Sequence, residues 1–165
     1  MRQFYPILIC LLATSSLLVA CAQSPHTART SATTRRTAAP ITPATYAGRQ
    51  LMVGNGGGVT GLSTTYYLLD NGQLFGRRSR DTVFTALGRK TVSRTKRTFR
   101  MAENDCRILT TQFDNPGNRY KFVGWRKGKR TKKITWGEPG TTPPATYPKF
   151  YDSFMATIPR AVRLD

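Results

Sequence analysis

Histidine, cysteine and acidic residues are scarce in this chain of 165 residues, which has one His, three Cys, and eight Asp and Glu against 26 Lys and Arg. A Ser-His-Asp triad would need the single histidine, His26, which lies in a stretch too polar to be held in a core. A zinc site takes most of its ligands from His and Cys. No two carboxylates are spaced as a catalytic pair, because most acidic residues fall at expected turns or helix ends. The composition therefore predicts a protein that is not an enzyme and holds no metal or cofactor.

The longest apolar run extends from Phe4 to Ala20 and follows a short basic start at Arg2. A membrane-spanning helix needs about 20 apolar residues, and this run is shorter and includes Pro6, Thr14, Ser15 and Ser16. A basic start, an apolar segment and small residues before a cut site are typical of a secretory signal peptide. We therefore predict an export signal over residues 1–20.

The end of that run, Leu18-Val19-Ala20-Cys21, resembles the lipobox of bacterial lipoproteins. The resemblance implies that Cys21 is lipidated and becomes the first residue of the mature chain. Ala22 and the absence of a following acidic run favour the periplasmic face of the outer membrane. We predict an envelope lipoprotein that reaches the membrane through its N-terminal lipid. An ordinary cleaved signal with a chance cysteine is the alternative.

Composition divides the rest of the chain into three parts. Residues 21–47 are rich in Thr, Ala, Ser, Arg and Pro, and such a stretch buries too little apolar surface to fold, so we expect a disordered tether. Residues 48–160 hold nearly all remaining aromatic and aliphatic side chains and predict a single domain. Residues 161–165 are expected to form a C-terminal tail. With Cys21 lipidated, Cys106 is left without a disulfide partner and is expected to be a buried apolar residue. We expect a monomer.

Hydrophobic patterning within the domain predicts hairpins and two helices. Strands are expected over residues 49–53, 62–69, 73–78, 82–87, 120–125 and 132–136. Asn71-Gly72 is typical of a type I′ hairpin turn. One helix is expected from Thr91 or Val92 to about Asn104, with Val92, Phe99, Ala102 and Cys106 on its apolar face. A last helix is expected after Thr146, with an apolar stripe formed by Tyr147, Tyr151, Phe154 and Ile158. The expected fold is α+β, an antiparallel sheet of four to six strands with two helices on one face.

Several short runs in the domain resemble a family of small Bacteroidota lipoproteins. They are Gly-Gly-Gly-Val-Thr-Gly at 56–61, Asp-Asn-Pro-Gly-Asn at 114–118 and Ile-Thr-Trp-Gly at 134–137. The similarity covers about residues 52–158. It implies an envelope location and brings no established activity and no catalytic residues.

The glycine run also matches the dinucleotide-binding string G-x-G-x-x-G through Gly56, Gly58 and Gly61. That fingerprint requires a helix N-terminus directly after it, whereas residues 62–69 predict a strand. We therefore expect a bend or bulge here. An alternative is a nest of backbone amides, from Gly56, Gly57, Gly58 and Gly61, that binds an anion. A FAD- or NAD-binding oxidoreductase is the less favoured reading.

Two basic runs, residues 77–100 and 119–133, hold most of the positive charge. An exported protein rarely meets nucleic acid, so an anionic lipid, lipopolysaccharide or acidic glycan is favoured as the partner over nucleic acid. The residues expected to form one cationic face are Arg94, Arg97, Arg100, Arg126, Lys127, Lys129, Arg130, Lys132 and Lys133. A soluble surface with no specific ligand is the simpler alternative.

A protein partner is the second functional hypothesis. The Tyr-rich hairpin around Asn71-Gly72 would offer a strand edge to which an extended segment of another protein could pair. The domain would then inhibit or escort a periplasmic protein.

Overall fold

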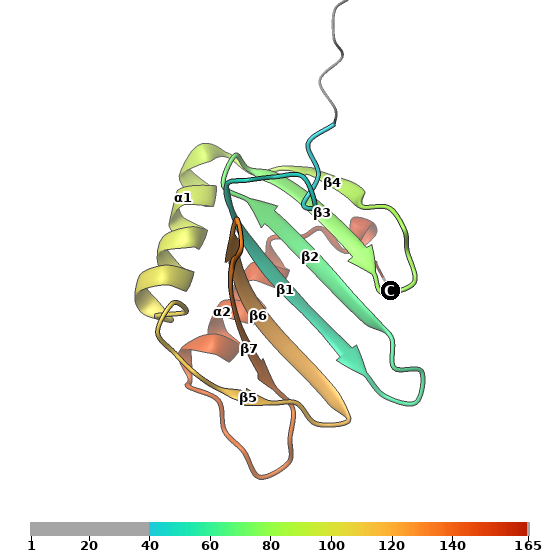
Figure 1. The fold of residues 1–165 in the computed structure, drawn as a ribbon, viewed down its shortest axis with the longest axis vertical. Helices are drawn as coiled ribbons and strands as arrows, with labels where there is room; N and C mark the ends of the chain where they lie inside the picture. Colours follow the sequence, from blue (N-terminus) through green and yellow to red (C-terminus); the bar gives the residue numbers. More distant parts are fainter. Residues whose placement is uncertain (1–39, 165) are drawn as a thin grey trace, which may run out of the picture. The chain divides into compact units, whose positions relative to one another are not determined.

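Seven strands form one open sheet in the computed structural model, which describes residues 40–164 (Figure 1). The strands are β1 (Arg49–Gly57), β2 (Ser63–Leu69), β3 (Gln73–Arg78), β4 (Thr85–Arg89), β5 (Asp114–Asn115), β6 (Arg119–Lys127) and β7 (Arg130–Trp136). Their order is β4-β3-β2-β1-β6-β7-β5, and every neighbouring pair is antiparallel except β5 with β7. The signal peptide and Cys21 lie outside the described residues.

Strand alternation gives this sheet one apolar face. Leu51 and Val53 of β1 pair with Trp125 and Val123 of β6, and cross-strand partners project from the same face. All four side chains are buried in one hydrophobic core. The helices pack on this face: α2 (Thr146–Ala156) lies behind the sheet in Figure 1, and α1 (Val92–Arg100) lies beside it. The predicted α+β class with two helices on one face is confirmed, and the seventh strand is the two-residue β5, which has no sequence signature.

Both helices follow the predicted positions with local differences. Thr91 caps α1 by accepting a hydrogen bond from the Arg94 amide, and the helix passes into a π-helical turn at Met101–Asp105. Val92 is 69% exposed, so its predicted place on the apolar face is wrong, and Thr95 is buried instead. The apolar stripe of α2 is confirmed for Tyr147, Tyr151 and Phe154, which are buried, whereas Ile158 is buried but lies two residues after the helix ends.

The hairpin between β2 and β3 turns differently from the type I′ prediction. That turn needs positive φ at both central residues, but only Gly72 has it here, at 91°. The Gly72 amide donates to Leu69 O at 2.8 Å, and Asn71 Oδ1 accepts from the Gln73 amide. These bonds place the tight turn one residue earlier, with Gly72 in the left-handed position that follows it.

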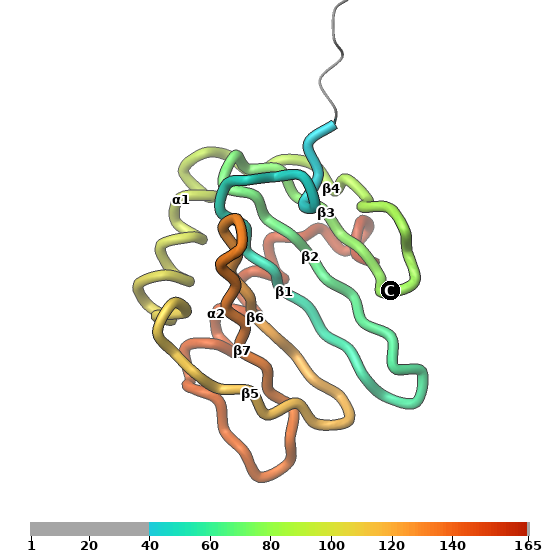
Figure 2. Tube along the Cα trace, viewed as in Figure 1, coloured from blue at the N-terminus to red at the C-terminus, as the bar shows by residue number. Residues whose placement is uncertain are grey.

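The fold extends further at both ends than the predicted boundaries 48 and 160. Figure 2 shows the chain crossing the end of the sheet before it enters β1. The buried Gln50 side chain donates to Pro43 O and Tyr46 O, both at 3.0 Å, and Arg126 also donates to Pro43 O. Residues 40–47, assigned to the tether, therefore belong to the domain. At the other end, the Leu164 amide donates to Tyr66 Oη at 2.9 Å, so most of the predicted tail is also part of the fold.

Candidate functional site

The nine cations expected to form one face are divided by the structure. Arg94, Arg97 and Arg100 are exposed on α1. On the β6–β7 hairpin, Lys132 pairs with Trp125, so it projects from the helix-bearing face, as do Lys127 and Arg130. Arg126 and Lys133 project from the opposite face, and Lys129 lies in the connecting turn. A period of two along a strand causes this division, because neighbouring residues point to opposite faces. The expectation of a single cationic face is therefore wrong.

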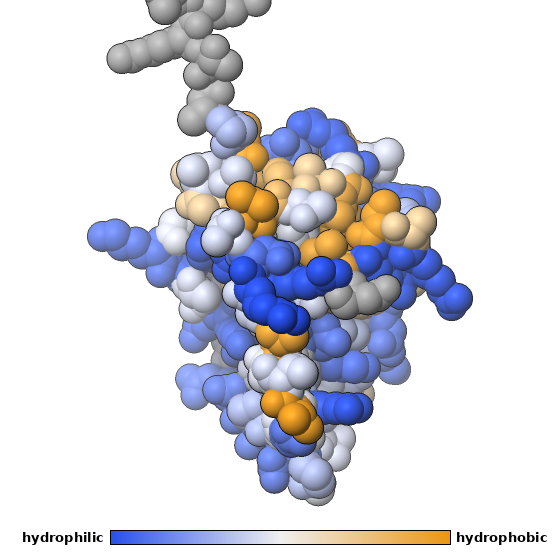
Figure 3. Space-filling model, turned by 90° about the vertical axis from the view of Figure 1, so that its right-hand side faces the viewer, coloured by the Kyte–Doolittle hydropathy of each residue, from blue (hydrophilic) through white to orange (hydrophobic). Residues whose placement is uncertain are grey.

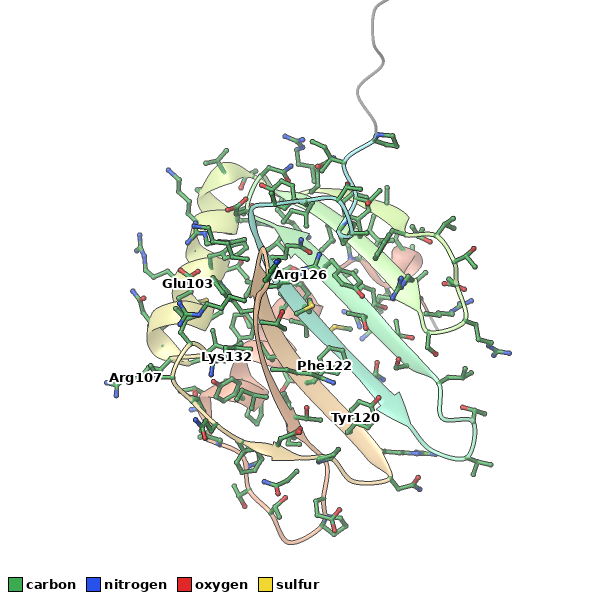
Figure 4. All side chains as sticks on the ribbon, in the orientation of Figure 1. Glu103, Arg107, Tyr120, Phe122, Arg126 and Lys132 are labelled. Atoms are coloured by element: carbon green, nitrogen blue, oxygen red, sulfur yellow. The ribbon has the colours of Figure 1, made fainter. Side chains whose placement is uncertain are left out.

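Most Lys and Arg side chains in residues 40–164 form no ion pair with Asp or Glu. In residues 40–164 both ion pairs involve Arg49, which lies 3.3 Å from Asp70 and 3.0 Å from Glu103. Glu103 also accepts from Trp125 Nε1 at 2.8 Å. Figure 4 shows Glu103, Lys132 and Arg107 on the side of α1, with Tyr120 and Phe122 further along β6. Two of the few carboxylates are thus used to hold Arg49, and they leave the surrounding cations uncompensated.

The glycine run neither cradles a nucleotide nor forms an amide nest. The Gly57 amide donates to Leu62 O, the Gly58 amide to Asn118 O and the Gly61 amide to Gly58 O. Three of the four proposed donors are therefore occupied within the protein. The segment that follows is β2, a strand, so the helix N-terminus required by the dinucleotide fingerprint is absent at this position.

The glycines instead let three backbones approach one another. A Cβ on Gly57, whose φ is 92°, would lie 2.0 Å from Asn118 O, and a Cβ on Gly137 would lie 2.1 Å from Arg119 O. Larger residues could not occupy either position without moving the chain. The close approach fixes the start of β6, and with it Arg119, against the ends of β1 and β7.

Beside this junction lies a hollow of about 790 Å³, which we call the basic hollow. It is lined by the ends of β1, β2, β3, β6 and β7 and by the β1–β2 turn. Four cations line it, namely Arg78, Arg80, Arg119 and Lys121, and no acidic residue is among its lining residues. Tyr120 and Trp136 add aromatic surface. The volume is within the range of small-molecule sites.

Strand register explains how distant residues meet in the basic hollow. Arg78 pairs with Thr64, Thr64 with Asn55, and Asn55 with Lys121. Lys121 in turn pairs with Trp136, so five strands contribute one row of side chains on the helix-bearing face. The next row inward contains the buried Val53 and Val123. The hollow therefore begins where the apolar core ends.

Part of the hollow is held in place by α2. Lys121 Nζ lies 4.8 Å from the centre of the Tyr151 ring, and the Trp136 ring packs edge-on against the same ring, 5.8 Å between centres. Burial raises the pKa of the Tyr151 phenol, and the negative field of Tyr66 and Asp152 adds to this effect. Tyr151 therefore stays neutral and supports the Lys121 cation through its ring face.

None of the hollow's four cations was among the nine selected from the sequence. Three of the four are Arg and the fourth is Lys121, and all four lie inside the two basic runs. The clustering of positive charge in these runs was therefore the sequence signal that could have pointed to them. Choosing between neighbours in such a run requires the strand register, which the sequence pattern leaves open.

The described groups with shifted pKa values do not provide a reactive centre. Burial raises the pKa of the Cys106 thiol, and its Sγ lies 3.7 Å from Thr146 O. Burial and the nearby Arg94 lower the pKa of Lys90, whose ammonium donates to Thr157 O. In residues 40–164, no three His, Cys, Asp or Glu side chains gather in a way that could hold a metal ion.

Comparisons with known proteins add no assignment. No protein-family model matches the chain, and no curated protein matches it either. Among the described residues, no helix is both long and apolar enough to cross a membrane.

Proposed function

We propose that this chain is a lipid-anchored envelope protein whose basic domain binds an anionic component of the bacterial envelope without catalysing a reaction. The partner classes are lipid head groups, lipopolysaccharide phosphates and acidic glycans. One observation carries the proposal: the chain has a formal charge of +18, and in its described part both ion pairs involve the same residue, Arg49.

Uncompensated charge of this kind has a direct physical consequence. Cations without acidic neighbours produce a positive potential that attracts anionic surfaces, and each exposed Lys or Arg near an anionic membrane contributes about 1 kcal/mol to its attraction. Lipidation at Cys21 would keep the domain close to such a surface on the periplasmic face of the outer membrane. The lipid anchor and the positive charge would then both hold the domain at the same surface.

Retention on immobilised lipopolysaccharide tests the proposal. The full chain, solubilised in a neutral detergent, is passed over lipopolysaccharide resin and over the same resin without lipopolysaccharide. We expect retention on the first resin alone, with release as the salt concentration rises from about 0.05 M to about 0.5 M, because the Debye length falls several-fold. Retention that does not change with salt, or equal retention on both resins, would contradict the proposal.

The lipid anchor is tested separately. Cells expressing the chain are fed a radiolabelled fatty acid, and the label on the purified protein is compared with that on the variant Cys21→Ser. We expect the label to be lost with the substitution, because no other residue is predicted to carry the lipid. Equal labelling of both proteins would contradict lipidation at Cys21.

A protein partner is a second candidate, but at a different edge from the one predicted. The Tyr-rich strand β2 lies inside the sheet, between β1 and β3, and β4 covers the outer side of β3. One edge of the sheet is β4, and Val83, two residues before this strand, is 70% exposed. Figure 3 shows hydrophobic residues gathered on the upper half of the adjoining face. An open strand edge with exposed apolar side chains is suited to pairing with an extended segment.

A pull-down with a substitution in β4 tests this candidate. Ala86 is exposed on the edge strand, and Ala86→Lys would hinder strand pairing by placing a charge there. We expect the variant to lose a partner that the wild-type chain recovers from periplasmic extract. Equal recovery by both proteins, or no partner in either, would contradict it.

A further inference from the structure

We propose that the basic hollow is a specific site for a disaccharide that carries an anionic group on each sugar ring. This inference rests on the proposed function and names the ligand class of one site. It starts from the row Arg78, Thr64, Asn55, Lys121 and Trp136, which crosses five strands on one face. The row has a cation near each end, two neutral polar side chains between them and an aromatic ring beyond Lys121.

The spacing of the two cations favours an extended ligand over a single ion. Arg78 lies on β3 and Lys121 on β6, three strand positions apart in the sheet order. Neighbouring strands are about 4.8 Å apart, so the two Cα atoms are separated by roughly 14 Å. Side chains on a strand stand roughly perpendicular to the sheet, and in that orientation one inorganic phosphate would not bridge Arg78 and Lys121. Two anionic groups joined by a pair of sugar rings match this separation.

The middle of the row fits sugar hydroxyls. Asn55 and Thr64 carry neutral donors and acceptors, and neither has a side-chain hydrogen bond to another residue in the part of the chain that the structure describes. An amide and a hydroxyl group can bond neutral hydroxyls in a geometry that an ammonium group does not reproduce. Together with the two cations, they distinguish an anionic saccharide from a simple polyanion.

The remaining lining residues support the same ligand class. Arg119 and Arg80 add two further cations at the rim, and the Arg119 side chain passes close to Gly58, where a Cβ would lie 3.6 Å from Arg119 Nε. The aromatic ring on the same face as the row is that of Trp136, the register partner of Lys121, and a sugar ring could pack against it. Tyr120 also lines the hollow, but its register with Gly56 places its ring on the opposite face, where Lys133 Nζ lies 5.7 Å from the ring centre.

Calorimetric titration of the full chain in neutral detergent tests the proposal. The probes are a sulfated heparin disaccharide, sucrose as the neutral disaccharide, and inorganic sulfate as the isolated anion. Three variants are compared: Arg78→Gln and Lys121→Gln in the hollow, and Arg97→Gln on α1. Arg97 is exposed on α1 and is not among the residues that line the hollow, so its substitution changes the net charge equally without touching the hollow.

The expected result is saturable binding of the heparin disaccharide at one site, with Kd raised about tenfold by Arg78→Gln and by Lys121→Gln, as for the loss of a charged hydrogen bond. Arg97→Gln should change Kd by less than twofold. If lipopolysaccharide micelles displace the bound heparin disaccharide, the natural ligand is a lipid-linked saccharide. If the micelles leave the heparin disaccharide bound, the natural ligand is a soluble saccharide.

Two results would overturn the inference. If all three variants weaken binding equally, only net charge matters and the hollow is not a specific site. If inorganic sulfate or sucrose binds as tightly as the heparin disaccharide, the ligand class is wrong. Either result can occur while the chain is still retained on lipopolysaccharide resin in a salt-dependent way, so failure of this inference is distinguishable from failure of the proposed function.

Discussion

Glu103 joins three elements, and its removal should be one of the more costly surface substitutions in the domain. The carboxylate lies in the π-helical turn after α1 and accepts from Arg49 Nη1 of β1 at 3.1 and 3.0 Å and from Trp125 Nε1 of β6 at 2.8 Å. Trp125 is 4% exposed, so its N–H has little access to water. We expect Glu103→Ala to leave that N–H without an acceptor.

The magnitude follows from the two contacts. The ion pair is partly exposed, with side chains 40% and 19% accessible, and such pairs contribute up to about 1 kcal/mol. A buried donor left unpaired costs about 1–3 kcal/mol. Together these contributions predict that Glu103→Ala lowers the free energy of unfolding by about 1–4 kcal/mol. Glu103→Gln keeps an oxygen for the indole and should cost about 1 kcal/mol, since it loses the ion pair.

Urea unfolding followed by far-ultraviolet circular dichroism measures these changes. Glu138→Ala is the matched control, because Glu138 is exposed, carries the same charge and its side chain makes no hydrogen bond or ion pair with other described residues. It should change stability by less than about 0.5 kcal/mol. The variant Trp125→Phe removes the N–H and keeps an aromatic ring, so Glu103→Ala should cost about 1–2 kcal/mol less in that background.

Two outcomes would refute this reasoning. If Glu103→Ala is no more destabilising than Glu138→Ala, the network contributes nothing to stability. If Glu103→Gln costs as much as Glu103→Ala, the indole N–H does not depend on the remaining oxygen.

Three further predictions concern other parts of the domain. Burial and the hydrogen bond to Asp70 raise the pKa of Tyr46 from 10.0 to about 12. As the pH rises, Tyr46 loses its proton in the unfolded chain before it does so in the folded chain, so the free energy of unfolding should fall between pH 10 and 12. Melting temperatures measured over this pH range should fall less for Tyr46→Phe than for the wild-type chain. Gly57→Ala should cost more than about 2 kcal/mol and Gly61→Ala about 1 kcal/mol, because only the first Cβ meets a backbone oxygen; equal costs in urea unfolding would contradict this. Cys106 is buried and its thiol pKa is raised, so iodoacetamide should label it much more slowly in the native chain than in urea, as read by peptide mass spectrometry.

Local patterns predicted most of the elements, because each depends on near neighbours in the chain. The stripe on α2 and the Thr91 cap of α1 follow from spacing alone. The patterns failed where tertiary contacts decide the outcome. Residues 40–47 have the composition of a tether, yet Gln50 and Arg126 bind their carbonyl groups. The two-residue strand β5 exists only because β7 is beside it.

At the candidate site, too, local patterns located the charge but tertiary contacts decided which residues meet. Charge clustering identified two basic runs in the sequence but placed their binding residues on one face. Alternation along β6 and β7 sends adjacent cations to opposite faces, and antiparallel register then brings Arg78 of β3 and Lys121 of β6 into one row. These two residues are 43 positions apart, and no local pattern relates them.

Composition and local spacing are properties of the chain itself, so the surplus of positive charge, the α+β class and the positions of the helices could be read directly from the residues. The basic hollow depends on which strands become neighbours and in which register. That choice is made by burial of the shared apolar face, with Leu51, Val53, Val123 and Trp125 at its centre, and by glycines that allow three backbones to meet. Because register is set by contacts across the whole sheet, only the folded structure could bring four scattered cations to one site.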